Sequence, residues 1–404
     1  MPRQSLSGST VAGMTMVTAG SMTANVAAYV LQLLALRWLG PSSYGEFASL
    51  LAAQLVLAVP ALALQSVVAR EVVHGKGAAA LRALGYRCAA IVAVIALVLV
   101  PVISAVLDTG LTPTLWALAA APLLVLLATE QGLLQGSGRF AELSIVLAGT
   151  GVAKVVPAVA VLAAGGGPGP MLLAAAIGTA AMVVVARLLE RRRGDSTGGA
   201  AVIGVGTVLR ASQVQLAMIA LSSVDLLIVR MVLSDTDAGI YAAGAVATKA
   251  AFWLPQAIGV VLYPRMANPA HSAAAVRSAL GVLFGLGAVL VVGAALVAPV
   301  ATMLFGDDYA PVQGILWMFA WNGAALAVLQ GALLSAIAGE RTHLAIVAWV
   351  GLAVEAVLMF TVADTVRQFV TVAASVATVT AGMAAILALR SAHTGDVPIV
   401  RSDS

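Results

Sequence analysis

The sequence predicts an all-α polytopic membrane protein of about twelve transmembrane helices, built as two parallel six-helix repeats with both termini cytoplasmic. Three observations predict this class. Of the 404 residues, 61% are hydrophobic and only 9% are charged, whereas a soluble domain carries roughly 25% charged residues. Apolar runs of about 20 residues, the length that crosses the hydrocarbon core, recur from end to end. Residues of the same type also recur in the two halves of the chain at a nearly constant offset.

The predicted spans follow these apolar runs. They cover 11–36, 46–67, 88–107, 112–134, 143–163, 169–188, 211–233, 239–262, 279–304, 312–337, 343–363 and 367–389. Runs rich in Leu, Val and Ala favour helices, because the strands of an outer-membrane barrel show about 10-residue segments of alternating polarity. The first run is long for a signal-peptide core and lacks a clear cleavage site, so we expect a retained first helix.

The orientation follows from the loop charges. Sixteen basic residues lie on one side of the predicted spans and three on the other, with Lys154 and Lys249 inside spans. By the positive-inside rule the basic side is cytoplasmic, which places both termini and the most basic loop inside the cell. The chain is therefore predicted to lie in the cytoplasmic (inner) membrane. The same topology explains the net charge of +4 without a nucleic-acid partner.

The repeat appears when the halves are compared at a nearly constant offset. Gly45 matches Gly239, and the other matched pairs are Pro60 and Pro255, Arg70 and Arg265, Arg82 and Arg277, Pro101 and Pro299, and Gln131-Gly132 and Gln330-Gly331. The stretch LLERRRGDSTGGAA lies between the halves and has the composition of a linker. We therefore predict a lobe at 1–190, a cytoplasmic linker at 191–200 and a second lobe at 201–404. Because each half has an even number of spans, the repeat is parallel.

Two segments carry a family resemblance. Residues 39–72, LGPSSYGEFASLLAAQLVLAVPALALQSVVAREV, resemble the second helix of bacterial oligosaccharide and polysaccharide flippases, which belong to the multidrug/oligosaccharidyl-lipid/polysaccharide exporter superfamily. Residues 224–267 resemble the seventh and eighth helices of the same group, with an Asp near mid-helix, a Gly-x-Tyr opening the next helix, and a Pro followed by Tyr-Pro. The resemblance implies two lobes around a central V-shaped cavity, lined by helices one, two, seven and eight, and alternating access.

Two ionisable residues lie deep in these presumed cavity helices. Lys249 lies ten residues inside the span 239–262, about 15 Å deep at 1.5 Å per residue, and Asp225 lies at a similar depth in the span 211–233. Each costs about 3 kcal/mol at the bilayer centre. Lys249 is predicted to meet the substrate diphosphate and Asp225 to couple transport to an ion gradient. The alternative is an ion pair between them that only makes their burial tolerable.

Further substrate-binding candidates are polar residues of the presumed cavity helices and of their mouths. They are Asn25, Gln54 and Gln256 as neutral donors and acceptors, Arg210 at the cytoplasmic mouth, and Arg37 at the outer end of the first helix. A guanidinium can fork onto phosphate oxygens. For Arg37 and for Arg230, its near-equivalent at the outer end of the seventh span, a snorkelling anchor is a simpler explanation than a product-side phosphate contact. Lys154 and Glu355 occupy equivalent positions in the repeat and are predicted to be structural polar groups inside the lobes.

Enzyme and cofactor chemistry find no support in the sequence. The four His residues lie in loops or the tail without acidic or Cys partners at ligand spacing, so no metal site is predicted. No Walker motif is present, which excludes ATP as the direct energy source. No loop is long enough for a transferase domain. We therefore expect neither an enzyme nor a cofactor.

The function predicted from the resemblance is a flippase. Its substrate would be a polyprenyl-diphosphate-linked oligosaccharide or polysaccharide precursor, and its partners membrane lipids, a polysaccharide polymerase and glycosyltransferases. The alternative is a multidrug or small-molecule/cation antiporter of the same superfamily. Two features weigh against that alternative: no carboxylate lies in the first helix, and the cationic Lys249 suits an anionic substrate.

Overall fold

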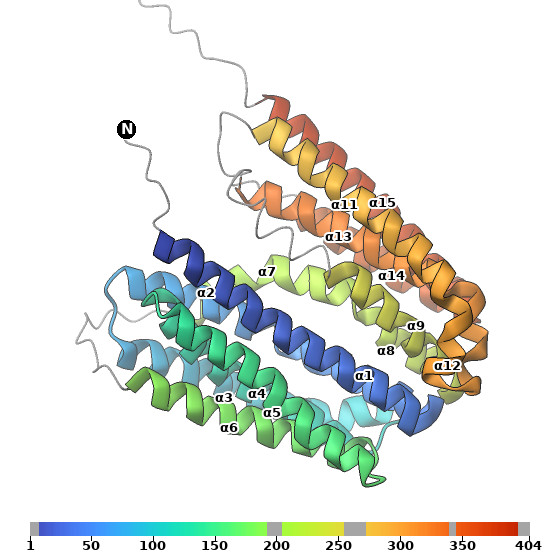
Figure 1. Ribbon diagram of the computed structural model, residues 1–404, viewed down its shortest axis with the longest axis horizontal. Helices are drawn as coiled ribbons and strands as arrows, with labels where there is room; N and C mark the ends of the chain where they lie inside the picture. Colours follow the sequence, from blue (N-terminus) through green and yellow to red (C-terminus); the bar gives the residue numbers. More distant parts are fainter. Residues whose placement is uncertain (1–7, 192–203, 254–271, 339–344, 395–404) are drawn as a thin grey trace, which may run out of the picture. The chain divides into compact units, whose positions relative to one another are not determined.

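The computed structural model describes residues 8–191, 204–253, 272–338 and 345–394, and every regular element in these ranges is a helix (Figure 1). Within them, nine helical segments are long and apolar enough to span a membrane. One of the nine, Thr15–Val73, contains both of the first two predicted spans. A shorter apolar helix covers Ile346–Val362. The predicted all-α polytopic membrane fold is confirmed.

The first two spans are not separated by the predicted loop. Helix α1 (Gly8–Leu57) continues through it and is interrupted only at Gly40, whose φ is 71°. Glycine reaches this left-handed region without a steric penalty. Pro41 then directly follows as a first helical position, where its missing N–H costs nothing. The polar residues after it therefore extend a helix instead of forming a loop. Helix α2 (Val59–Val73) follows after a break at Ala58.

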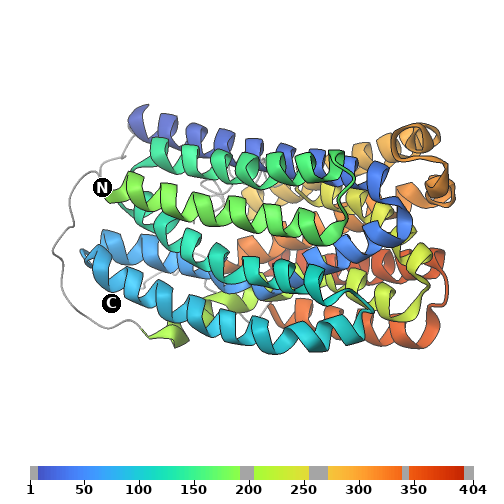
Figure 2. The same cartoon turned by 90° about the horizontal axis from the view of Figure 1, so that it is seen from below.

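Four further helices complete the N-terminal part: α3 (Ala78–Val106), α4 (Leu111–Gly136), α5 (Phe140–Ala163) and α6 (Pro168–Arg191). They run side by side, with α5 along α1 and α4 packed against α2, α3 and α6 (Figure 2). Helix α3 begins at residue 78 instead of the predicted 88. Its first turns are helical although they carry Arg82, because that side chain finds carboxylate partners inside the bundle.

After the predicted linker come two shorter helices and a longer one: α7 (Val205–Leu221), α8 (Val224–Val232) and α9 (Asp235–Trp253). The predicted span 211–233 is therefore broken at residues 222–223, and the end of the predicted span 239–262 lies outside the described residues. Then follow α11 (Ser272–Val297), the 3₁₀ turn Ala298–Val300, α12 (Ala301–Phe305), the 3₁₀ segment Asp307–Ile315, α13 (Leu316–Ala338), α14 (Ala345–Val362) and α15 (Val366–Thr394).

The chain divides into two compact units, Met1–Ile219 and Ala220–Ser404. The division falls inside α7, after the predicted linker 191–200, most of which lies outside the described residues. The packing of α7 explains this position. Val208 near its start is buried in a cluster with Leu64 and Leu81 of the N-terminal unit. Most of α7 therefore packs with the N-terminal unit, although the sequence repeat assigns it to the second half.

In the C-terminal unit, α13 lies close to α9 because glycines face bulky neighbours. Gly244 of α9 lies against the Phe319 ring, and Gly323 of α13 lies against the Thr248 carbonyl oxygen. The Thr248 hydroxyl donates a 2.9 Å hydrogen bond to the Phe319 carbonyl oxygen. Small residues and Ser or Thr hydroxyls are the usual contacts between membrane helices. This packing fixes α9, which carries two of the residues of the candidate site.

Candidate functional site

The candidate site is centred on Asp225, which is 4% exposed, in the first turn of α8. The break at Ser222 and Ser223 makes this position a helix N-terminus in the middle of the predicted span. The first N–H groups of a helix have no intrahelical partners, and a carboxylate is favoured beside them. The Leu226 N–H donates a 2.8 Å hydrogen bond to Asp225 Oδ1.

Tyr241 of α9 holds the other carboxylate oxygen. Its hydroxyl donates a 2.8 Å hydrogen bond to Asp225 Oδ2, and its side chain is fully buried. The Tyr241 ring packs edge-on against Phe319 of α13 and Phe369 of α15, with ring centroids 5.1 Å and 6.2 Å apart. Three helices therefore fix the direction of the hydroxyl group that contacts Asp225.

Two more ionisable side chains lie within electrostatic range of this carboxylate. They are Glu355 of α14, which is buried, and Lys249, two turns beyond Tyr241 on α9. Among the described residues, Asp225 and Lys249 form no ion pair within 4 Å, but each charge acts electrostatically on the other, so the alternative of an ion pair between them stays a prediction. Glu355 interacts electrostatically with Asp225 and Tyr241. Glu355, predicted to be a structural polar group, therefore lies within electrostatic range of the candidate site.

The remaining predicted site residues are not all brought to this cluster. Lys154 lies in α5 and Asn25 and Gln54 lie in α1, all in the N-terminal unit; Gln54 is buried and the other two are partly buried. Arg37 is exposed on α1, before the Gly40 kink. Arg210 lies in α7, and Gln256 lies outside the described residues.

Sequence reasoning missed Tyr241 as a site residue. A signal existed, because Gly239-Ile240-Tyr241 forms the Gly-x-Tyr pattern at the start of the eighth predicted span, and Tyr241 and Lys249 lie eight residues apart on one helix face. The helix break before Asp225 carried no comparable signal. Two adjacent serines do not by themselves predict the end of a membrane helix.

Arg230 at the end of α8 is also placed differently from a snorkelling anchor. Its side chain is buried and forms a 2.9 Å ion pair with Asp235 at the start of α9. This contact ties the two helices together at the end of the turn between them. It thereby helps to hold Asp225 and Tyr241 at hydrogen-bonding distance.

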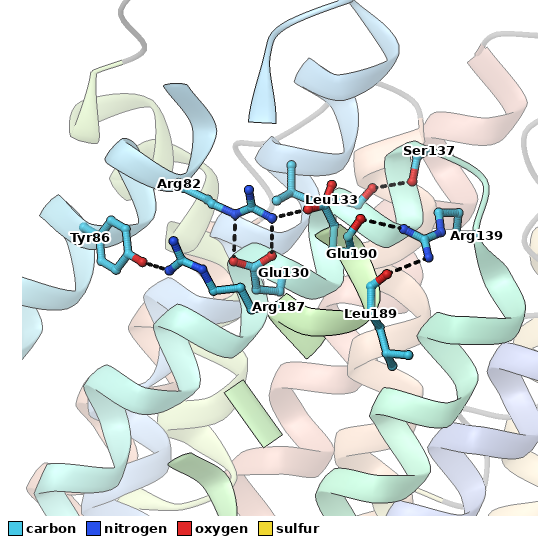
Figure 3. A network of polar contacts seen from close by, with 9 residues as sticks. All are labelled: Arg82, Tyr86, Glu130, Leu133, Ser137, Arg139, Arg187, Leu189 and Glu190. Atoms are coloured by element: carbon cyan, nitrogen blue, oxygen red, sulfur yellow. Dashed lines mark hydrogen bonds and ion pairs between the residues drawn. The ribbon is translucent and has the colours of Figure 1, made fainter. Parts of the chain in front are cut away.

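A second polar cluster lies in the N-terminal unit, at the helix ends predicted to be cytoplasmic (Figure 3). Arg82 of α3 makes a bidentate ion pair with Glu130 of α4, with Nε–Oε1 and Nη2–Oε2 distances of 3.0 Å, and also contacts Glu190 of α6. Arg139 donates to the Leu189 and Glu190 carbonyl oxygens at 2.9 and 3.2 Å. The Arg82 guanidinium and the Glu130 and Glu190 carboxylates neutralise one another, and their contacts join the ends of α3, α4 and α6.

Comparisons with known proteins identify the fold. A search against protein-family models and a search against curated proteins find no match. Among solved structures, the chain is similar to the inward-facing conformation of a multidrug resistance MATE family transporter of the MOP superfamily, with a TM-score of 0.71, 12% identity, and coverage of 95% of this chain and 98% of that one.

Two further structures give the same result. One is the eukaryotic MATE transporter AtDTX14, with a TM-score of 0.62, 16% identity and coverage of 95% and 96%. The other is the Vibrio cholerae MATE transporter VcmN in its bent form, with a TM-score of 0.61, 15% identity and coverage of 96% and 99%. At these identities the likeness establishes a fold that is shared over nearly the whole chain.

Proposed function

We propose that this chain is an exporter of small organic molecules that works by alternating access and is driven by exchange with protons. Asp225 is the group that takes up and releases the coupling proton. The observation that carries the proposal is the geometry of this carboxylate. It is buried, it accepts hydrogen bonds from Tyr241 and Leu226, and no cation of the described residues contacts it within 4 Å.

The physical argument rests on the cost of buried charge. An ionised carboxylate inside a membrane protein costs several kcal/mol unless a cation compensates it. A bound proton removes that cost, so occupancy of Asp225 and the conformation of its lobe are linked. Glu355 adds a second carboxyl group within electrostatic range. The shared fold supports an exporter of small molecules, because the similar structures are multidrug resistance and MATE transporters.

The test uses the purified full chain in proteoliposomes loaded with the lipophilic cation ethidium. An imposed pH gradient drives efflux by the wild type, and Asp225→Asn abolishes the gradient-driven part, because a neutral amide cannot exchange a proton. Asp364→Asn is the matched control, since that carboxyl is exposed before α15. Tyr241→Phe keeps the ring contacts but removes the hydrogen bond, and shifts the pH profile of transport. Undiminished efflux by Asp225→Asn would contradict the coupling role. Efflux driven only by a sodium gradient would identify Na⁺, and not the proton, as the coupling ion.

A second candidate function is translocation of a polyprenyl-diphosphate-linked saccharide. It is favoured by Lys249, which is partly exposed and contacts no carboxylate of the described residues within 4 Å. A cation at mid-depth would offset the desolvation cost of a diphosphate. In this case Lys249→Ala lowers translocation by about tenfold or more, equivalent to about 1.4 kcal/mol, and Lys249→Arg keeps part of it. Proteoliposomes that move a fluorescent polyprenyl-diphosphate saccharide but not ethidium would establish this function instead.

A further inference from the structure

An apolar groove in the C-terminal unit has no role in the proposed transport cycle. It is lined by residues of α11, α13 and α15, and its volume is about 470 Å³. Its lining is almost entirely apolar and includes the larger side chains of Leu283, Phe284 and Val328 together with Gly281 and Gly382. A volume of this size is typical of sites for small ligands.

The few polar groups in the groove already have partners. The indole N–H of Trp321 donates a 2.8 Å hydrogen bond to Thr378 Oγ1, and the Thr378 hydroxyl donates a 2.6 Å bond to the Ala374 carbonyl oxygen. The lining therefore offers no free donor or acceptor from this pair, and it matches a hydrocarbon chain. Phe284 is 69% exposed, which shows that the groove opens to the surroundings of the unit and is not sealed within it.

One end of the groove is positively charged. Arg277 lies one turn before Leu280 on α11, and Arg390 directly follows Leu389 on α15; both leucines line the groove and both arginines are exposed. The start of α11 lies beside the end of α15 (Figure 1). Neither arginine contacts a carboxylate of the described residues within 4 Å. This is the end that the positive-inside rule assigns to the cytoplasm.

The N-terminal repeat shows how unusual this end is. Arg82, the counterpart of Arg277 in the repeat, is buried against Glu130 and Glu190. In the C-terminal unit, the residue aligned with Glu130 is the fully buried Leu329, and the last helix carries Arg390 where α6 carries Glu190. The repeat thus has an internally neutralised cluster in one lobe and two arginines without these carboxylates in the other. Two exposed arginines at one end of an apolar groove are complementary to an anionic group.

We propose that the groove between α11, α13 and α15 binds an anionic phospholipid of the cytoplasmic leaflet, with one acyl chain in the groove and the phosphate at Arg277 and Arg390. Guanidinium groups bind phosphate oxygens through paired, charge-assisted hydrogen bonds. Basic sites between membrane helices on the cytoplasmic side are typical binding sites for anionic headgroups. The lipid phosphate neutralises Arg277 and Arg390, as Glu130 and Glu190 neutralise Arg82 in the N-terminal lobe.

The test measures lipid retention on the full chain by native mass spectrometry. The purified protein is titrated with phosphatidylglycerol or with phosphatidylcholine of the same acyl chains. The wild type retains phosphatidylglycerol about tenfold better, a ratio that corresponds to about 1.4 kcal/mol. Arg277→Gln together with Arg390→Gln lowers its retention to that of phosphatidylcholine. Equal retention of the two lipids by the wild type, or no effect of the double variant, would overturn the proposal.

Variants at glycines test the acyl-chain part separately. A Cβ at Gly382 meets nothing within 4 Å, so Gly382→Leu fills the groove without disturbing the backbone. It lowers the retention of both lipids. Gly293→Leu is the matched control, because Gly293 has the same open space on α11 but does not line the groove. Equal losses in the two variants would contradict the site.

A measurement on the unmodified chain keeps the proposal testable if a variant does not fold. Phosphatidylglycerol with a photoreactive acyl chain labels peptides of α11, α13 and α15 in the wild type, and labelling confined to other helices refutes the groove. A dimer that Gly382→Leu dissociates would identify a second copy of the chain as the occupant and would also refute the lipid.

Discussion

At Asp225 the cost of burying a carboxylate is offset by hydrogen bonds from one side chain and one backbone N–H. The donors are Tyr241 and Leu226, both at 2.8 Å. Hydrogen bonds to a charged group contribute about 1.5–3 kcal/mol each, which is comparable with the insertion cost of an acidic side chain. The two hydrogen bonds therefore offset part of the cost of the charged state.

A double variant separates coupling from charge compensation at this site. If Asp225 served only to neutralise Lys249, Asp225→Asn combined with Lys249→Met would restore transport. We expect no rescue, because Tyr241 and not Lys249 contacts the carboxylate. The measurement is proton-driven ethidium efflux at matched protein levels, with Lys249→Met alone as the control. Full activity of the double variant would show that Asp225 has no coupling role.

At the scale of the element, two helix boundaries differ from those that the polarity of the sequence predicts. The α1 helix passes through the polar stretch after Arg37 and bends only at Gly40, where φ is 71°. Conversely, the apolar seventh span breaks at Ser222 and Ser223, and the break places Asp225 at a helix start. Short and broken helices near mid-membrane are typical of ion and substrate sites in transporters.

The contact between α9 and α13 leads to a stability prediction. Gly323→Ala introduces a Cβ that collides with the Thr248 carbonyl oxygen and lies 2.9 Å from Ala251 Cβ. Overpacking of this kind costs about 1–3 kcal/mol. We expect a lower thermal unfolding midpoint in detergent, measured by intrinsic fluorescence. Gly285→Ala on α11 is the control, because a Cβ there meets nothing within 4 Å. An unchanged midpoint for Gly323→Ala would show that the close contact between α9 and α13 does not contribute to stability.

The polar cluster at the helix ends of the N-terminal unit gives a second prediction. Arg82→Gln leaves two glutamates facing each other, and loss of one partner of a buried ion pair costs about 3–5 kcal/mol. Arg277→Gln removes the corresponding arginine of the other repeat, which is exposed, and costs less than about 1 kcal/mol. Unfolding midpoints of the two lipid-free variants measure the difference. Equal midpoints would mean that the Arg82 cluster does not stabilise its lobe.

At the scale of the whole molecule, two halves of similar pattern have acquired different polar interiors. In the N-terminal unit, Arg82 joins α3 to α4 and α6 through ion pairs at the predicted cytoplasmic helix ends. The C-terminal unit holds its buried charges around Asp225. Under the proposed function, the second unit binds the coupling proton, and ion pairs between helix ends stabilise the first unit.

The membrane orientation of the whole chain is the last prediction. Both termini and the linker 191–200 are expected on the cytoplasmic side, because sixteen of nineteen loop basic residues lie there. Cysteines are placed at Gly167 and Arg192 in a Cys88→Ala background and probed with an impermeant thiol reagent in whole cells. Gly167 suits this test because a Cβ there meets nothing within 4 Å. Labelling at 167 alone is expected, and labelling at 192 alone would reverse the topology.

Composition and periodicity were sufficient for the fold class and for most of the helices. Lipid cannot satisfy backbone polar groups, so a long apolar run in this chain has to become a helix. Regular helical spacing also located Lys249 and Asp225 at similar depth, since depth along a helix follows directly from residue number. The likeness of the halves was visible for the same reason, because equivalent residues keep equivalent positions along their helices.

The partners of those residues depend on how the helices pack. The contact of Tyr241 with Asp225, the approach of Glu355 and the burial of Arg82 between two glutamates join residues on different helices. Such contacts depend on the rotation of each helix about its axis and on which helices are neighbours. Both are set by the close packing of glycines and aromatic rings across the bundle. A single sequence gives the depth of a side chain in the membrane, whereas the packed bundle determines which groups it meets there.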